Sequence, residues 1–256
     1  MDRMIVRELA AAVAAGLPVV VATVIETDRS VPRRPGSSML IFGDGRQSGS
    51  IGGGEMEARV VEEANAAFAG RRPRTLDFEL VDPASGDPGV CGGTVTIYLE
   101  PHVATETVYV FGCGHVGRAV IDLAHWLGYR VVAVDDRSEL ANVENLPNAD
   151  AVIAGSIHDA IATEPITEET WVVVVTRNAK LDLEIVPVVL QTPARAIGVM
   201  GSRRRWKITR NQLREQGVDA AALDQVMSPI GVEIHAETPE EIAVSVMAEI
   251  TQHRRG

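Results

Sequence analysis

A short glycine motif between an apolar strand and a helix constrains the fold of this chain more than any other feature. Residues 112–117 read GCGHVG and directly follow an apolar run at 107–111. The next apolar run, 130–134, ends in Asp135 and Asp136, about 20 residues after the motif. A strand, a glycine turn, a helix and an acidic residue in this order form the dinucleotide-binding fingerprint. The sequence therefore predicts a Rossmann-type nucleotide site.

Each glycine of this motif has a separate expected role. Gly112 permits a tight turn, Gly114 lets a phosphate approach the backbone, and Gly117 lets the helix pack on the strand. The N-terminus of the helix offers unpaired N–H groups and a favourable dipole to an anion. Asp135 is placed to accept hydrogen bonds from a ribose or another diol. We expect a phosphate-bearing ligand to bind at this turn.

The second half of the chain alternates apolar runs with helical patterns. Near-continuous apolar strands separated by helices are typical of a parallel sheet that is buried on both faces. We therefore predict an α/β fold, with a small N-terminal α/β domain at 1–103 and a C-terminal domain at 104–256 that holds a Rossmann-type, doubly wound parallel sheet. The expected strands of the second domain are 107–111, 130–134, 151–154, 171–175 and 195–199, and its expected helices are 116–127, 180–190, 203–215 and 239–252.

The first domain contains a second glycine-rich segment, which reads GSIGGGE and leads into a helical pattern that continues to residue 69. Its glycines Gly52, Gly53 and Gly54 either let a ligand approach the backbone or make a tight connection between a strand and a helix. Glu55 and Glu57 suit the N-terminal end of a helix without any catalytic role. The other expected elements of this domain are a helix at 3–15 and strands at 18–25, 38–42, 74–80 and 94–99.

The two cysteines lie beside glycines and have no zinc-binding spacing. Cys91 precedes Gly92 and Gly93 in a loop, where a thiolate is exposed enough to bind a soft metal. A lone cysteine is also commonly a small buried side chain. Cys113 is expected to fill space in the glycine turn, and His115 to be a loop residue. Because no disulfide framework is implied, we expect a reduced, cytoplasmic setting.

Composition and charge exclude several classes of protein. A net charge of −11 disfavours a nucleic-acid partner, because the phosphates would be repelled. The basic cluster at 203–214 is either a phosphate site or a solvated helix face. No apolar run is long enough to cross a membrane, and acidic residues near the N-terminus argue against a signal peptide. Hydrolytic chemistry has no support, since the sequence holds no P-loop, nucleophile elbow or HExxH motif.

These segments, in this order, resemble those of the XdhC/CoxI family over nearly the whole chain. Two positions depart from the family pattern: Glu55 stands where many members have a cysteine, and Ala179 where many have a histidine. Any cofactor contact made by those residues in other members is absent or replaced in this chain. The matching segments are RRPGSSM at 33–39, GSIGGG at 49–54, CGGTV at 91–95, FGCGHVG at 111–117, DDR at 135–137, TR at 176–177, IGVMGS at 197–202, SPIG at 228–231 and TPEEIA at 238–243.

The resemblance implies an accessory chaperone that binds molybdenum cofactor, as molybdopterin or its cytosine dinucleotide form. It implies delivery of that cofactor to a hydroxylase of the xanthine dehydrogenase or CO dehydrogenase type. The phosphate tail would lie at the glycine turn, and the Cys91 thiolate would meet the molybdenum. A cysteine desulfurase and a second copy of the chain are further expected partners. The expected cofactor-binding residues are Gly52, Gly53, Gly54, Cys91, Gly92, Gly93, Gly112, Gly114, His115, Val116, Gly117, Asp135, Thr176 and Arg177.

Two other classes of function stay open on the residues alone. The fingerprint and Asp135 would equally serve an NAD(P)-dependent oxidoreductase, whose acid or base would come from His115, His158 or Asp182. A regulatory module that senses a dinucleotide without chemistry is the third class. A binding chaperone is favoured, because it needs affinity and release but no catalytic constellation, and the sequence offers none.

Overall fold

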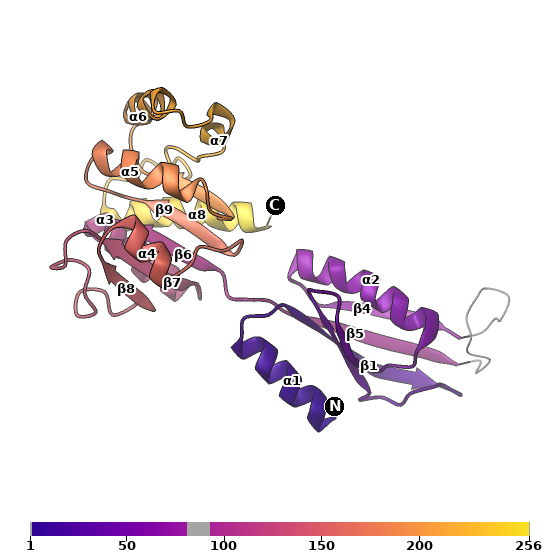
Figure 1. The fold of residues 1–256 in the computed structure, drawn as a ribbon. Coiled ribbons are helices and arrows are strands. Elements are labelled where there is room, and N and C mark those ends of the chain that lie inside the picture. The colour runs from indigo at the N-terminus through magenta and orange to yellow at the C-terminus, as the bar shows by residue number, and fades with distance from the viewer. Residues whose placement is uncertain (1, 81–92, 256) are drawn as a thin grey trace. The chain divides into compact units, whose positions relative to one another are not determined.

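The computed structural model describes residues 2–80 and 93–255, and the chain divides into two compact units, Met1–Ala104 and Thr105–Gly256 (Figure 1). Each unit has its own sheet and its own apolar core. Within the two described ranges, no helix is both long enough and apolar enough to cross a membrane.

The N-terminal unit is a five-stranded antiparallel sheet with a helix packed on each face. Its strands are ordered β3-β2-β1-β5-β4. Side chains alternate along the central strand, so Val20 packs in the same cluster as α2, whereas Val19 and Val21 pack with α1. The elements are α1 (Arg3–Ala14), β1 (Val19–Asp28), β2 (Ser38–Phe42), β3 (Gln47–Gly49), α2 (Gly54–Gly70), β4 (Arg74–Glu79) and β5 (Thr94–His102).

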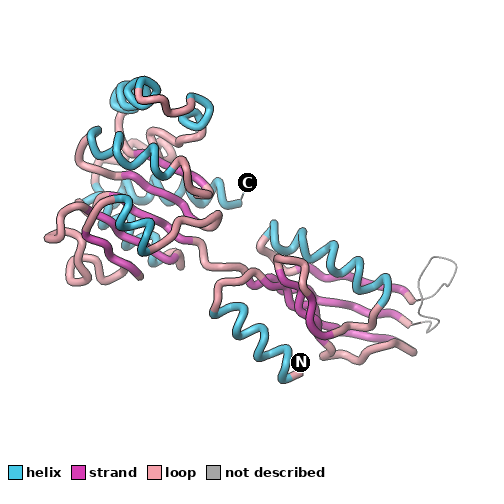
Figure 2. Tube along the Cα trace, in the orientation of Figure 1, coloured by secondary structure: helices cyan, strands magenta, loops and turns pink. Residues whose placement is uncertain are grey.

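The C-terminal unit is a doubly wound parallel sheet, which confirms the predicted fold class. Its strands are ordered β10-β9-β6-β7-β8, so β6, the first strand of this unit, lies at the centre and the order reverses beside it. Figure 2 shows how strands and helices alternate along this unit. The elements are β6 (Thr107–Phe111), α3 (His115–Trp126), β7 (Arg130–Asp135), β8 (Ala151–Ala154), α4 (Ile157–Thr163), β9 (Thr170–Val174), α5 (Ala179–Val189), β10 (Ala196–Val199), α6 (Arg203–Glu215), α7 (Ala220–Asp224) and α8 (Pro239–Arg255).

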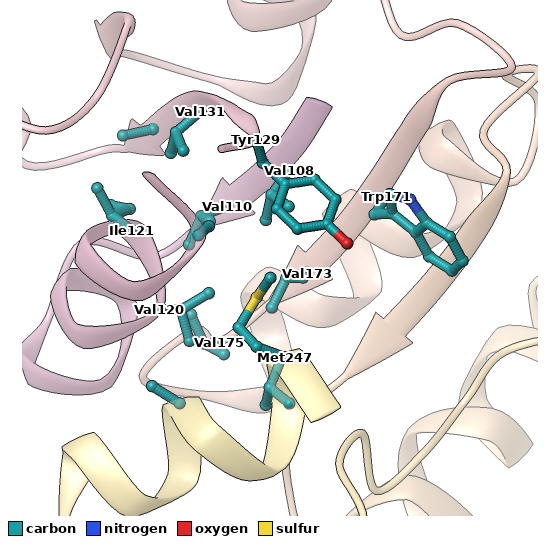
Figure 3. Close-up of a cluster of buried hydrophobic side chains, with 14 of the residues drawn as sticks. Val108, Val110, Val120, Ile121, Tyr129, Val131, Trp171, Val173, Val175 and Met247 are labelled. Atoms are coloured by element: carbon teal, nitrogen blue, oxygen red, sulfur yellow. The ribbon is translucent and has the colours of Figure 1, made fainter. Parts of the chain in front are cut away.

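Alternate side chains of β6 belong to two cores on opposite faces of this sheet. Val108 and Val110 pack with Val120 of α3 and Met247 of α8 (Figure 3). Phe111 belongs to the other cluster, to which α4 and α5 contribute. This double burial explains why the strand reads as an uninterrupted apolar run in the sequence.

Every helix and strand expected from the sequence is present, but three short elements were missed: β3, α4 and α7. Helix α4 has seven residues, which is too short to show an apolar periodicity. It begins with a capping box in which Ser156 and Asp159 bond each other's backbone, so the pattern S-x-x-D could have marked its start. Helix α7 begins at the capping residue Asp219 and has five residues.

A buried carboxylate joins the start of β6 to the last helix. Glu106 is 3% exposed. Its Oε2 lies 2.6 Å from Nε of Arg254 on α8, and its Oε1 lies 3.4 Å from Nη1 of Arg195. A buried carboxylate is tolerated when nearby cations compensate for its lost hydration. These ion pairs therefore fix the two ends of the C-terminal unit to each other.

Glu106→Gln should destabilise the C-terminal unit by about 3 kcal/mol, because it leaves two guanidinium groups without their buried counter-charge. Urea unfolding followed by the fluorescence of Trp171, which is buried in this unit, measures the loss. The matched control is Glu168→Gln, since Glu168 is exposed. Equal stability of the two variants would show that the buried ion pairs contribute little.

Candidate functional site

Close backbone contacts require two of the three glycines in the fingerprint turn. Gly112 has a φ of 108°, and a Cβ there would lie 2.6 Å from the carbonyl oxygen of Val175. A Cβ on Gly117 would lie 1.7 Å from the carbonyl oxygen of Gly112. A side chain at either position would collide with the backbone, so the tight turn and the close packing of α3 depend on glycine.

Gly114 has the opposite surroundings. It is the N-cap of α3, and beyond Gly114 and its immediate chain neighbours the described residues place no other part of the fold within 4 Å of the position of its Cβ. No described side chain caps this helix by accepting a hydrogen bond from the backbone N–H groups at its start. The amides of the first turn of α3 therefore have no side-chain acceptor in the described part of the chain. A helix N-terminus of this kind, with free space beside it, is suited to bind an anion.

A cavity of about 580 Å³ opens at the carboxyl ends of β6, β7, β8 and β9. This is the edge at which open α/β sheets bind ligands, next to the strand where the order reverses. Apolar side chains line part of the cavity, and charged side chains come from the segments after β7 and β9. The lining residues are Phe111, Gly112, Val134, Asp135, Asp136, Arg137, Gly155, Ser156, Ile157, His158, Thr176, Arg177, Leu181, Glu184 and Ile185.

The fold brings some of the predicted site residues together and separates others. Gly112, Asp135, Thr176 and Arg177 all line the cavity, although they come from three different strand ends. His115 is exposed at the start of α3 and lines a separate groove between α3 and α8. The sequence analysis did not single out Arg137 on its own, although its place directly after two aspartates in the DDR segment was a usable signal.

Protein donors already engage the carboxylate of Asp135. Its Oδ1 accepts hydrogen bonds from the backbone N–H of Arg137 (3.0 Å) and from Nε of the same residue (2.9 Å). Its Oδ2 accepts from the backbone N–H of Cys113 (2.8 Å) and from Nη2 of Arg137 (2.9 Å). An ionised carboxylate has about four acceptor positions. The ribose-binding role of Asp135 stays a prediction, and it would require one of these donors to move away.

A second ion pair joins the segments after β7 and β9, the two neighbours of β6. Arg177 donates from Nη1 and Nη2 to the two carboxylate oxygens of Asp136, at 2.6 and 2.7 Å. These hydrogen bonds from Arg177 lower the pKa of Asp136 to about 2, and they raise the pKa of Arg177 in turn. Both side chains therefore stay charged at neutral pH, beside the cavity that they line.

Thr176 belongs to a buried polar cluster with Asp182 and Arg205. Asp182 is 1% exposed, and its Oδ2 lies 2.6 Å from Nη2 of Arg205. The Thr176 hydroxyl donates to the other oxygen of the same carboxylate. Asp182 is thus held in a buried ion pair and does not line the cavity, whereas His158 does. Arg205 comes from the basic cluster at 203–214, so part of that cluster is structural.

Of the two cysteines, the structure describes Cys113 only. Cys91 and Gly92 lie outside the described residues, so the predicted metal ligand is not placed. Cys113 is buried, and burial together with a neighbouring carboxylate raises the pKa of its thiol to about 12. It therefore stays protonated at neutral pH and fills space. Gly93 is buried too, and a Cβ there would lie 2.5 Å from a carbonyl oxygen at the end of β1, so backbone packing accounts for this glycine.

A carboxylate of the chain itself occupies the N-terminal glycine loop. Glu57 Oε1 accepts hydrogen bonds from the Ser50 hydroxyl (2.8 Å) and from the amides of Gly53 (2.9 Å) and Ile51 (3.1 Å). The glycines at 52–54 all have positive φ, and the amides of Gly52 and Gly53 point toward this oxygen. The connection between strand and helix thus explains the glycine-rich sequence of this loop. A ligand there would have to displace Glu57.

Comparison with known protein families finds matches along both units. Residues 108–250, more than half of the chain, match the XdhC Rossmann domain, and residues 12–79 match the XdhC and CoxI family. A crystal structure of a xanthine dehydrogenase from Bacillus halodurans superposes with a TM-score of 0.52 and 24% identity, over 96% of this chain and 94% of that one. At this identity the likeness shows the fold alone.

Three relatives are similar in sequence. The uncharacterized protein YqeB of Escherichia coli (strain K12) is 32% identical over 92% of this chain and 43% of its own length. A protein of Bacillus subtilis (strain 168) that is named as a probable xanthine dehydrogenase component is 28% identical over 63% of this chain and 47% of its own length. The molybdenum cofactor insertion chaperone PaoD of E. coli is 22% identical over 98% and 88%. The chain thus spans less than half the length of the first two relatives.

Gly117→Ala should destabilise the C-terminal unit by about 3 kcal/mol, because the new methyl group forces α3 away from the turn. Gly114→Ala is the control, since the space beside Gly114 is open, and it should change stability by about 0.5 kcal/mol or less. Urea unfolding followed by tryptophan fluorescence measures both. A loss that is equal in the two variants would contradict the roles assigned to these glycines.

Glu57→Gln should lower the thermal midpoint by a few degrees at pH 7 and by less in acid. Burial tends to raise the pKa of Glu57, but hydrogen bonds from Ser50 and the amides of Ile51, Gly53 and Gly52 outweigh it, so the pKa lies below its ordinary value. A carboxylate with a lowered pKa stabilises the fold above its unfolded pKa and loses that effect as pH falls through the folded pKa.

Melting curves recorded by circular dichroism between pH 7 and pH 3 test this dependence. The Glu55→Gln variant is the matched control, because Glu55 is exposed in the same helical turn. A difference between Glu57→Gln and the unmodified protein that stays constant down to pH 3 would rule out the carboxylate as its source.

Proposed function

Because the chain belongs to the XdhC and CoxI family, we propose that it binds molybdenum cofactor and delivers it to a molybdenum hydroxylase. The proposal rests mainly on one observation: the uncapped N-terminus of α3 lies in the same turn as Gly112, which lines a cavity of about 580 Å³. Relatives named as a molybdenum cofactor insertion chaperone and as a probable xanthine dehydrogenase component support the same role.

The tail of the cofactor fits the glycine turn chemically. Molybdopterin ends in a phosphate, and its dinucleotide form carries a diphosphate in the same place. A phosphate beside Gly114 would accept hydrogen bonds from the free amides of the first turn of α3 and gain from the helix dipole. No side chain at Gly114 stands in the way of such an approach.

The cavity fits a flat heterocycle with polar edges. Its volume lies within the roughly 300–1,000 Å³ that is typical of sites for small organic ligands. Phe111, Ile157 and Leu181 supply apolar walls, and the segments after β7 and β9 supply charged groups for the ring edges. A pterin ring would be shielded on its faces and recognised at its edge. Among the described residues, no group of three histidines, cysteines or acids could hold a metal ion. We therefore keep Cys91, on the basis of the sequence, as the proposed ligand of the molybdenum.

An NAD(P)-dependent oxidoreductase is the second candidate, because the same turn and cavity would accept a dinucleotide. One observation counts against NAD as its cofactor, and another counts against Asp182 as its acid or base. The carboxylate of Asp135 is occupied by four donors, and Asp182 is held by Arg205. His158 is then the remaining acid or base among the three residues considered for this role. The hydroxylase client, a cysteine desulfurase and a second copy of the chain all stay proposed partners.

Protein purified from a host supplied with molybdate should carry molybdenum and pterin, measured by mass spectrometry of the metal and by fluorescence of the oxidised pterin. Gly114→Val should reduce both at least about tenfold while the fold survives, because the valine fills the phosphate position. Cys91→Ser should keep the pterin but lose molybdenum, since an alcohol oxygen is a poor ligand for a thiophilic metal.

Gly70→Ala serves as a control, because Gly70 lies at the end of α2 in the other unit, with an ordinary φ and open space beside it. Purified protein that carries neither molybdenum nor pterin but binds NADH or NADPH would replace the chaperone proposal with the oxidoreductase. Full pterin content in a folded Gly114→Val protein would remove the glycine turn from the site.

A further inference from the structure

The end of β7 presents a guanidinium group to the cavity where a nucleotide site is expected to present a carboxylate. In a Rossmann site the acidic residue that ends the second strand accepts hydrogen bonds from the ribose diol. That residue here is Asp135, whose side chain is 2% exposed and bonded to four donors. With its acceptor positions filled, this carboxylate cannot bind a diol without losing Arg137 or the Cys113 amide.

Arg137 is the residue that remains available to a ligand at this point. Its side chain is 33% exposed and lines the cavity. Asp135 takes its Nε and one N–H of Nη2, which leaves Nη1 and the second N–H of Nη2 as donors. The two hydrogen bonds that the guanidinium donates to Asp135 also fix its plane, so its free edge is preorganised.

Arg177 adds a second cation to the same wall. Its side chain is 40% exposed, and its two hydrogen bonds to Asp136 leave Nε and one N–H on each terminal nitrogen. The hydrogen bond to Asp135 raises the pKa of Arg137, whereas repulsion from the nearby charge of Arg177 opposes this rise. An anionic ligand group between them would relieve this repulsion, whereas a neutral diol would not.

We propose that this cavity selects ligands that carry a phosphate group at the end of β7 over ligands that present a free ribose diol there, and that Arg137 determines this specificity. The inference rests on the proposed function in taking this cavity as the ligand site. Within that function it counts against the form of the cofactor that is extended by a nucleotide, because the ribose of that nucleotide would present a free diol at the end of β7.

Two adenosine phosphates test the selection directly, because they differ by one group at the position of the diol. 2′,5′-ADP carries a phosphate on the 2′ oxygen, and 5′-AMP has the free diol. Isothermal titration of the full chain should give at least about tenfold tighter binding of 2′,5′-ADP, since the phosphate gains charge-assisted hydrogen bonds that the diol lacks. Equal affinities, or no binding of either compound at millimolar concentration, would overturn the proposal.

Variants of the two arginines test which side chain causes the preference for 2′,5′-ADP over 5′-AMP. Arg137→Leu removes the guanidinium and frees the two acceptor positions of Asp135 that it filled, so 2′,5′-ADP should weaken and 5′-AMP should strengthen until the preference is lost or reversed. Arg177→Met leaves the Asp135 bonds intact and should weaken 2′,5′-ADP severalfold with no effect on 5′-AMP. Arg118→Leu is the control for loss of charge, because Arg118 lines the separate groove between α3 and α8.

If Arg137→Leu does not fold, Arg177→Met still decides the matter, because an unchanged preference in that variant contradicts recognition by the paired arginines. The molybdenum and pterin contents of the purified protein separate this inference from the proposed function. Protein that carries pterin but binds both adenosine phosphates equally refutes the selection alone. Protein that prefers 2′,5′-ADP but carries no pterin refutes the chaperone role and keeps the phosphate site.

Discussion

The buried carboxylate of Asp135 holds the candidate site together. Through the amide of Cys113 it fixes the glycine turn, and through Arg137 it fixes the segment that follows β7. Burial of an ionised carboxylate costs several kcal/mol unless hydrogen bonds replace its lost hydration. The four donors to Asp135 meet this requirement, and their geometry in turn determines which groups of the turn and of β7 are left for a ligand.

The two glycine-rich turns of this chain show how similar sequences lead to different chemistry. At 51–53 the amides point at the Glu57 carboxylate, so the chain supplies its own anion. At the start of α3 no described side chain takes that place, and the amides stay available. Both turns need glycine because of their backbone conformation or close backbone contacts. The amides of the first turn bond a carboxylate of the same unit, whereas the amides of the second stay available beside a cavity.

The cavity depends on topology as much as on its residues. Strand β6 lies between β7 and β9, so the segments that follow those two strands meet across its end. The ion pair between Asp136 and Arg177 joins residues 41 positions apart in the chain, and it exists because the strand order reverses at β6. Oppositely charged side chains from the two segments thus face each other at the place where open α/β sheets bind their ligands.

The sequence by itself determined the fold class, the positions of the long helices and strands, and the roles of Gly112 and Gly117, because these follow from local periodicity and from backbone sterics. Short elements such as α4 and β3 were not predicted from the sequence, since a few residues carry too little periodic signal. Tertiary structure decided which charged side chains are held by hydrogen bonds and ion pairs within the chain. The sequence pointed to Asp135 as a ligand for a ribose diol and to Asp182 as a candidate acid or base, but each is bound by donors that the fold brings to it from distant segments. A hydrogen bond between distant residues leaves no trace in local sequence, because its partners are brought together only when the sheet assembles.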